Sequence, residues 1–262
     1  MSLHVEFAGD PTHPTIVFLH GLGVSSWMWA EQVQHLSGRF HCVTVDLPGN
    51  GASHEMPWSS FDDTADAVAE VIAAIPPGRA HVVGLSLGGY VAVTLIARHP
   101  AVVDNVVVSG VTAEPLRPVW RNRLLARAGG AVMRHPRLTR AYGTAMRLPR
   151  EARDAMAADA GVLTRATTRR IYDEIVPFQL PGAMNAHAAR ILAVAADHDV
   201  RSIRCGLDTF AAVGASVAVA RDAHHAWNAE HPQLFSDMVE AWVTDRTVPG
   251  QLLAPARPEP TR

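Results

Sequence analysis

The sequence contains no lysine, so every basic side chain other than histidine is an arginine. No function follows from that absence alone. Acidic and basic residues nearly balance, and the formal net charge is −2. A chain with so small a net charge has no general electrostatic attraction to polyanions. We therefore expect neither nucleic acid nor a membrane among its partners.

Cysteine is also scarce, because Cys42 and Cys205 are the only two. They form no CxxC motif and have no metal-ligand spacing to histidines, so no metal site is predicted. A reduced, intracellular and therefore cytoplasmic protein fits this usage best. No run of about twenty apolar residues occurs, so no transmembrane helix is expected. The first ten residues lack the basic start and apolar stretch of a signal peptide.

Short apolar runs alternate with helix-like segments through the first half of the chain and again near its end. The runs TIVFLH, FHCVTVDL and AHVVGLS read as strands, and SSFDDTADAVAEVIAAI and LGGYVAVTLIARH read as helices. Such alternation is typical of a parallel sheet with helices on both faces. We therefore predict an α/β fold with a mostly parallel, twisted sheet flanked by helices.

The alternation stops between about residues 111 and 187, where arginine-rich helical stretches replace the strands. We expect a core domain from residues 1–112 and 188–246, interrupted by a helical insertion over residues 113–187. The remaining residues, 247–262, contain four prolines and are predicted to be a disordered tail. The sequence does not indicate an oligomeric state.

One serine, Ser86, follows a predicted strand and precedes a predicted helix, with Gly84 and Gly88 two residues away on each side. Ligands of parallel sheets bind at the carboxyl ends of the strands, where this serine is expected to lie. Glycines there allow a very tight turn that leaves the hydroxyl exposed. This G-x-S-x-G pattern in a strand–turn–helix context predicts a catalytic nucleophile. A helix-capping serine in a glycine-rich loop is the simpler alternative.

Acyl transfer needs two hydrogen-bond donors for the developing oxyanion. The backbone N–H of Leu87, directly after the serine, is one candidate. The N–H of Leu22 is the second, since it lies in the glycine-rich loop His20-Gly21-Leu22-Gly23 that follows an early strand. An ordinary glycine-rich turn would explain that loop equally well if the serine pattern were absent.

A serine hydroxyl also needs a histidine base and a carboxylate that orients it. Near the end of the chain, ADHD offers Asp197 and Asp199, and ARDAHHAW offers His224 and His225. The chain order serine, acid, histidine is the one that this architecture requires. Position along the chain does not by itself choose between the two acids or between the two histidines.

Together these motifs resemble those of the α/β-hydrolase superfamily over residues 3–246. DLPGNGAS, residues 46–53, is similar to the family element between the oxyanion loop and the nucleophile. The resemblance implies Asp199 as the acid, through the last residue of ADHD. It implies His225 as the base, because Glu230 and Pro232 follow at the family spacing. The sequence departs from the pattern at Ala196 and before His225, where glycine is usual, and it lacks the proline after the acid.

The resemblance implies a serine hydrolase that cleaves a carboxylic ester or lactone of a small molecule through an acyl-enzyme, without a cofactor. Alternatives with the same three residues are thioester hydrolysis, C–C bond hydrolysis and cofactor-free perhydrolysis. A non-catalytic small-molecule receptor is a further alternative. Relatives with an aspartate nucleophile are disfavoured by Ser86.

The insertion would then be a cap over the site. Residues 113–187 hold 13 arginines against six acidic residues, so the cap is strongly basic. A basic cap could steer an anionic substrate, or its arginines could simply be solvated on amphipathic helices. Trp27, beside the oxyanion loop, is a candidate for the substrate pocket, with packing in the core as the alternative.

Overall fold

The computed structural model describes residues 2–252. A seven-stranded sheet with strand order β1-β3-β2-β4-β5-β6-β7 forms its centre. Only β1 is antiparallel to its neighbour, and the remaining pairs are parallel. The strands are β1 (His4–Ala8), β2 (Thr15–Leu19), β3 (His41–Asp46), β4 (Ala80–Leu85), β5 (Val103–Ser109), β6 (Ile191–Ala196) and β7 (Ser216–Ala220). The predicted mostly parallel α/β fold is confirmed.

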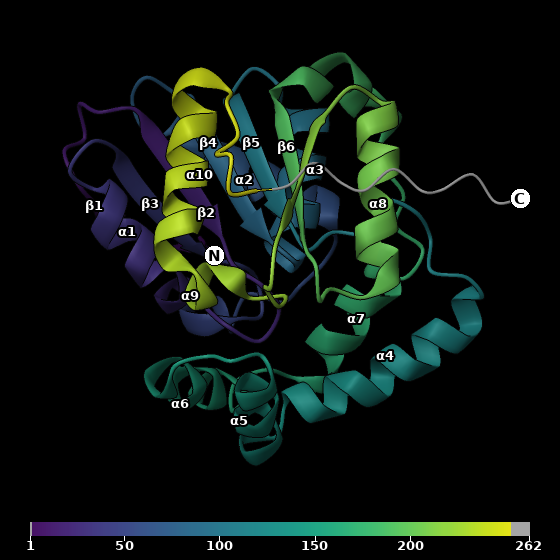
Figure 1. Ribbon diagram of the computed structural model, residues 1–262. Helices are drawn as coiled ribbons and strands as arrows, with labels where there is room; N and C mark the ends of the chain where they lie inside the picture. Colours follow the sequence, from purple (N-terminus) through teal and green to yellow (C-terminus); the bar gives the residue numbers. More distant parts are fainter. Residues whose placement is uncertain (1, 253–262) are drawn as a thin grey trace, which may run out of the picture.

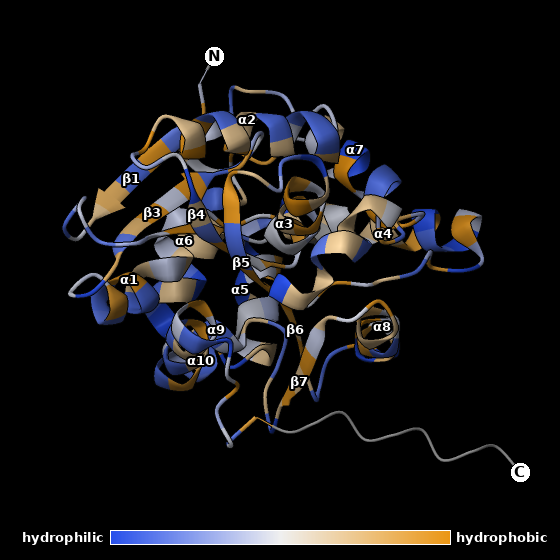
Figure 2. Ribbon diagram, turned by 90° about the horizontal axis from the view of Figure 1, so that it is seen from above, coloured by the Kyte–Doolittle hydropathy of each residue, from blue (hydrophilic) through white to orange (hydrophobic). Residues whose placement is uncertain are grey.

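Helices cover both faces of the sheet (Figures 1 and 2). On one face lie α1 (Ala30–Leu36), α9 (Trp227–Glu230) and α10 (Pro232–Asp245), and on the other lie α2 (Phe61–Ala73), α3 (Leu87–Arg98) and α8 (Arg201–Ala212). Short 3-10 helices span Ser26–Trp29, Gly51–Ser53 and Gly182–Arg190.

The two faces have separate apolar cores because side chains alternate along each strand. In β2, Ile16 and Phe18 pack toward α1 and α10, whereas Val17 and Leu19 pack toward α2 and α3. All four side chains are fully buried. Strands buried on both faces explain why the parallel strands read as almost continuous apolar runs in the sequence.

Helix α2 illustrates how local signals set the boundaries of an element. The hydroxyl of Ser60 accepts a hydrogen bond of 3.0 Å from the backbone N–H of Asp63, which caps the helix. Asp62 and Asp63 lie in the first turn, where negative charge complements the helix dipole. The helix ends at Ala73, before the Pro-Pro-Gly sequence of residues 76–78.

Between β5 and β6 the chain forms four helices, α4 (Val119–Met133), α5 (Pro136–Ala145), α6 (Arg150–Asp159) and α7 (Arg165–Ile175). Helix α5 packs against α6, and α4 packs against α7. Figure 1 shows α4, α5 and α6 together beyond one end of the sheet. The chain leaves and re-enters the core side by side, because Leu116 N–H donates to Val176 and Leu180 N–H donates to Ala113. We call residues 113–187 the cap.

The segment after α10 differs in part from the expected disordered tail. Leu252 is only 6% exposed, and Val248 packs against the apolar core on the α10 side. Burial of these two side chains stabilises a connection without helix or strand, in which the Leu252 N–H donates to the Pro249 carbonyl at 3.0 Å. Residues 253–262, the rest of the predicted tail, lie outside the described residues.

Candidate active site

Ser86 lies in a tight turn between β4 and α3, at the carboxyl end of the sheet. Its φ of 53° is in the left-handed region, which a residue with a side chain adopts only under local constraint. The Ser86 N–H donates to the carbonyl of Ser109 in β5 at 2.8 Å. This hydrogen bond and the start of α3 hold the strained turn in place.

The glycines flanking the serine are required by close backbone approach. A Cβ on Gly84 would lie 2.3 Å from the carbonyl oxygen of Gly88. A Cβ on Gly88 would lie 2.0 Å from the carbonyl oxygen of Leu19 in β2. Both distances are far below van der Waals contact, so any larger residue would push α3 away from the sheet.

Asp199 and His225 come together from two different loops at the same end of the sheet. Asp199 follows β6 and His225 follows β7, and their side chains are joined between Oδ1 and Nδ1 at 2.6 Å. The second Asp199 oxygen accepts the N–H of Ala196 at 2.9 Å, and the Asp199 side chain is only 2% exposed. A carboxylate at Nδ1 favours the tautomer with the proton there, which leaves Nε2 as the basic nitrogen.

The neighbouring acid, Asp197, has a structural role in the loop that precedes the histidines. It accepts the backbone N–H groups of Asp222 at 2.7 Å and of Ala223 at 3.0 Å. Burial opposes ionisation of Asp197, but these backbone donors outweigh it and lower its pKa. Asp197 therefore shapes the loop that carries His225 and does not contact that histidine.

The other histidine, His224, turns toward Glu230. Its Nδ1 lies 3.2 Å from a Glu230 oxygen, and its backbone N–H donates to the second oxygen at 2.8 Å. Glu230 thus holds both the backbone and the ring of His224 in place. The structure thus pairs Asp199 with His225, whereas Asp197 contacts the backbone of residues 222–223 and His224 contacts Glu230.

Sequence reasoning missed Gly110, which lies against the His225 ring. A Cβ on Gly110 would be 2.5 Å from Cε1 of His225, and its φ is +72°. Its N–H donates to the carbonyl of Val194 at 3.1 Å, which extends the β5–β6 pairing by one residue. A lone glycine directly after a buried strand was the available signal, because such a position often marks close approach of another group.

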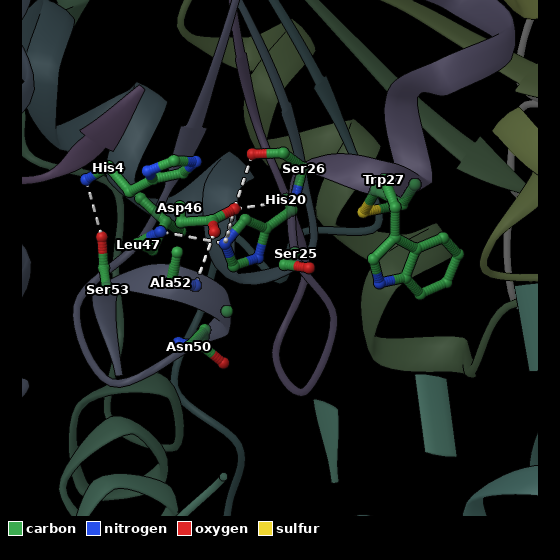
Figure 3. Close-up of polar contacts among 12 residues, drawn as sticks. His4, His20, Ser25, Ser26, Trp27, Asp46, Leu47, Asn50, Ala52 and Ser53 are labelled. Atoms are coloured by element: carbon green, nitrogen blue, oxygen red, sulfur yellow. Dashed lines mark hydrogen bonds and ion pairs between the residues drawn. The ribbon is translucent and has the colours of Figure 1, made fainter. Parts of the chain in front are cut away.

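The loop that contains Leu22 is held by His20, which is completely buried. One ring nitrogen of His20 lies 2.7 Å from the Gly21 carbonyl oxygen. The other lies 2.9 Å from the Leu47 nitrogen (Figure 3). Because the carbonyl can only accept and the Leu47 N–H can only donate, Nδ1 carries the proton and Nε2 is the acceptor. Burial lowers the pKa of His20 and keeps this neutral form.

Two buried polar side chains connect the same loop to the DLPGNGAS segment. Asp46 accepts the N–H and hydroxyl of Ser26 and the N–H of Ala52 (Figure 3). Asn50 accepts the N–H of Gly23 at 3.1 Å. Hydrogen bonds to a buried carboxylate are stronger than those between neutral groups. This network explains why an aspartate and an asparagine occur in a segment that supplies no candidate catalytic residue.

Within residues 2–252, the backbone N–H groups of Leu22 and Leu87 donate to no protein acceptor. The N–H of Leu87 is the first of α3, so it has no partner inside the helix. Both residues are close to Ser86, one through its loop and the other as the next residue. The pair therefore has the donor capacity that an oxyanion site requires.

A cavity of about 190 Å³ lies between these loops and the cap. Ser86 and His225 both line it, as do Leu22 and Trp27. Tyr172 is one of the few polar lining groups, and burial raises its pKa to about 12, so its hydroxyl stays neutral. Most of the remaining wall is apolar and includes four methionines, Met28, Met133, Met146 and Met156. The cavity therefore suits an uncharged, largely apolar group.

Trp27 lines this cavity and also joins the oxyanion loop to the cap. Its Nε1–H donates to the Asp159 carboxylate at 2.7 Å, and the Ser25 hydroxyl donates to the same oxygen at 2.9 Å. Asp159 is the last residue of α6. Trp29, by contrast, is fully buried against Phe18 and Phe235 and belongs to the core.

Asp159 should make the stability of the protein depend on pH. Burial raises the pKa of Asp159, against the opposing effect of the Trp27 and Ser25 hydrogen bonds. The folded state then binds a proton at Asp159 more readily than the unfolded chain does. The contribution of Asp159 to the free energy of unfolding therefore falls as the pH rises above the ordinary aspartate pKa of about 3.9. Relative to Asp159→Asn, the wild-type free energy of unfolding should decline over that window, measured by urea denaturation.

Asp154, on the same helix α6, is the matched control. A hydrogen bond from Arg140 lowers its pKa, so the difference between wild type and Asp154→Asn should change with pH in the opposite direction. Equal slopes for the two variants would contradict the assignment to Asp159.

None of the 13 cap arginines lines the cavity that contains Ser86. Several form ion pairs on the cap surface. Arg140 and Arg150 contact Asp154, and Arg147 contacts Glu230 at 3.3 Å. The wall around Ser86 therefore carries no arginine charge. Four other arginines, Arg127, Arg134, Arg165 and Arg169, line a separate groove of the cap.

Over residues 2–252, no group of three or more His, Cys, Asp or Glu side chains is arranged to hold a metal ion. In the same part of the chain, no helix is long and apolar enough to cross a membrane.

A strained serine on a strand–helix turn and a carboxylate–histidine pair at the same sheet edge define the α/β-hydrolase class of enzymes. The model of the α/β-hydrolase family matches residues 16–238, and the chain belongs to this family. It is therefore an enzyme of the hydrolase class, as predicted.

Individual relatives differ in the share of this chain that they match. An AB hydrolase superfamily protein of Gibberella zeae is 27% identical over 255 residues, covering 92% of this chain and 83% of that protein. A pimeloyl-[acyl-carrier protein] methyl ester esterase of Chromobacterium violaceum is 47% identical over 100 residues, which is 38% of this chain and 37% of that enzyme. The crystal structure of the enol-lactonase from Burkholderia xenovorans LB400 has a TM-score of 0.75 at 23% identity, covering 93% of this chain and 96% of that chain.

Proposed function

We propose that this enzyme hydrolyses a carboxylic ester or lactone of a small molecule through an acyl-enzyme on Ser86. The observation that carries the proposal is the 2.6 Å contact of Asp199 with His225, on a cavity that Ser86 also lines. A serine becomes a nucleophile only when a base removes its proton, and the base works only when it is held in the right tautomer. These three residues supply both requirements.

In the first half of the reaction, Ser86 Oγ attacks the ester carbonyl carbon while His225 Nε2 accepts the hydroxyl proton. The Leu22 and Leu87 N–H groups donate to the oxyanion that forms on the carbonyl oxygen. Asp199 stabilises the imidazolium through Nδ1. The tetrahedral intermediate then collapses: the C–O bond to the leaving group breaks, and His225 gives its proton to the departing alkoxide.

In the second half, His225 removes a proton from water, and the hydroxide attacks the acyl carbon of the ester on Ser86. Collapse returns the proton to Ser86 Oγ and releases a carboxylic acid. Among the described residues the Ser86 hydroxyl has no hydrogen-bond partner. Contacts between a nucleophile and its base often tighten only when substrate is bound.

The surroundings of Ser86 favour an ester with a short, uncharged acyl group. The cavity of about 190 Å³ presents a mostly apolar wall that contains no acidic residue and no arginine, and His225 is its only histidine. A charged acyl group bound in this cavity would lose its hydration without gaining an ion-pair partner. The names of two relatives are consistent with an ester or lactone substrate, since one is a methyl ester esterase and the other an enol-lactonase.

The proposal is tested with a fluorophosphonate probe and a substrate panel. The probe should label the wild-type enzyme at Ser86, located by peptide mass spectrometry, because only an activated serine reacts with it. Short methyl and p-nitrophenyl esters and a simple lactone should be hydrolysed with higher kcat/KM than matched thioesters or β-diketones. An unlabelled serine would indicate a non-catalytic receptor. A thioester or diketone at the top of the panel would replace the ester proposal with one of the alternative reactions.

A further inference from the structure

The charged groove of the cap lies between α4 and α7 and has a volume of about 600 Å³. We propose that it binds an anionic group, a phosphate or carboxylate, carried by the substrate whose ester is cleaved at Ser86. This inference rests on the proposed function and adds a second binding site for the same substrate.

The shape of the groove is set by small residues on its floor. Ala126, Gly130 and Ala131 come from α4, and Ala166 and Thr168 come from α7. A Cβ on Gly130 would lie 3.3 Å from the Cβ of Thr168, so the helices approach closely there. Four arginines stand around this floor, and no acidic residue lines it.

The positive charge of these arginines is largely unbalanced. Arg127 and Arg169 share the Asp173 carboxylate with Arg123, at 3.6–3.8 Å. Within residues 2–252, Arg134 and Arg165 have no carboxylate within 4.0 Å. One carboxylate therefore serves three guanidinium groups, and two more have none.

One of the arginines is already held in position. Arg134 Nη1 donates to the Gly130 carbonyl at 2.7 Å and to the Thr168 hydroxyl at 2.8 Å. Its other nitrogens remain as donors. A guanidinium fixed before binding loses less entropy when an anion arrives, and its planar donors match a carboxylate or phosphate.

The first turn of α7 faces the same groove through Arg165, Ala166 and Thr168. That turn contains no acidic residue and carries Arg165 at its first position. Cations at a helix N-terminus oppose the helix dipole, whereas an anion complements it. An anion beside Arg165 would therefore offset both the repulsion among the arginines and the unfavourable position of Arg165.

The groove is next to the catalytic cavity. Tyr172 of α7 lines both spaces, and Met133 of α4, which lines the cavity, directly precedes Arg134 of the groove. A substrate with its ester at Ser86 and an anionic end past Tyr172 would use both. A basic cap and an apolar cavity then serve one substrate, because the anionic group binds in the groove and the ester binds in the cavity.

The test compares methyl esters of one chain length that end in a hydroxyl, a carboxylate or a phosphate. For the wild-type enzyme the anionic esters should have lower KM than the hydroxyl ester at equal ionic strength, and whichever of the two has the lower KM identifies the anion. Arg165→Gln and Arg169→Gln should each raise KM for the anionic esters by roughly three- to tenfold, the scale of a charged hydrogen bond partly screened by solvent. Turnover of the hydroxyl ester should not change.

Arg121→Gln is the matched control, because Arg121 is an exposed arginine of α4 that does not line the groove. It removes the same charge from the cap and should leave KM for all three esters unchanged. Equal KM for anionic and hydroxyl esters in the wild type, or an equal effect of Arg121→Gln and Arg165→Gln, would overturn the proposal.

A binding measurement separates this site from the catalytic proposal. Pyrophosphate, titrated into the wild-type enzyme by calorimetry, should bind, and the affinity should drop in Arg165→Gln but not in Arg121→Gln. If no ester is hydrolysed but pyrophosphate shows this pattern, the proposed reaction fails and the anion site stands. If pyrophosphate does not bind, or binds equally to all three proteins, the anion site fails whatever the esterase activity.

Discussion

Replacing Ser86 by alanine is expected to lower kcat for p-nitrophenyl acetate by about five to six orders of magnitude, as loss of the nucleophile does in a comparable serine hydrolase. The residual rate would come from the oxyanion donors Leu22 and Leu87 and from binding. The substitution removes one oxygen and leaves the flanking glycines, so the turn should persist.

Equal folding of the Ser86→Ala protein is checked by thermal unfolding, and Ser202→Ala on α8 is a control for loss of a serine hydroxyl away from the cavity. Ser202→Ala should keep wild-type kcat. A Ser86→Ala protein that still turns over the ester at a substantial fraction of the wild-type rate would mean that another group is the nucleophile.

Replacing Asp199 by asparagine is the second large effect, with kcat expected to fall by roughly four orders of magnitude, as for the orienting acid of another triad. The asparagine amide cannot stabilise an imidazolium, and it can present N–H to Nδ1, which moves the ring proton to Nε2. His225 would then no longer be able to accept the Ser86 proton.

Asp197→Asn is the matched comparison, since it makes the same change two residues away. Asp197 contacts the backbone of Asp222 and Ala223, and one amide oxygen can still accept from them. We expect a modest loss of stability and little change in kcat. In the same way, His225→Ala should lose activity and His224→Ala should show little change in kcat. A large loss of kcat in Asp197→Asn or His224→Ala would show that Asp199 or His225 is wrongly assigned.

Features that depend on local chain geometry were predictable from the sequence. The start of α2 at Ser60 and its end before the two prolines follow from capping and proline rules, which act over a few residues. The turn at Ser86 was predictable for the same reason, because its glycines are within two residues of it. The β5–β6 insertion was visible as a change of hydrophobic period.

Features that depend on how the cap sits on the core were not predictable. The contact between Trp27 and Asp159 joins residues 132 positions apart, and no periodicity in the sequence relates them. The 13 cap arginines looked alike in the sequence, yet the fold places four of them around the groove and others in surface ion pairs such as that of Arg140 with Asp154. Gly110 was overlooked because its reason, the His225 ring, comes from a loop more than one hundred residues later.

The four methionines of the cavity wall bear on how sharply this enzyme can discriminate among acyl groups. A methionine side chain is unbranched and polarisable, so it refills space at little cost when its neighbour changes. Met133, Met146 and Met156 belong to the cap and Met28 to the core, so the wall can adapt from both sides. Even a rigid apolar pocket separates two substrates that differ by one methylene by only about 10- to 200-fold in kcat/KM. A wall of thioethers will give a graded preference for acyl length, and sharp selection must come from polar contacts outside it.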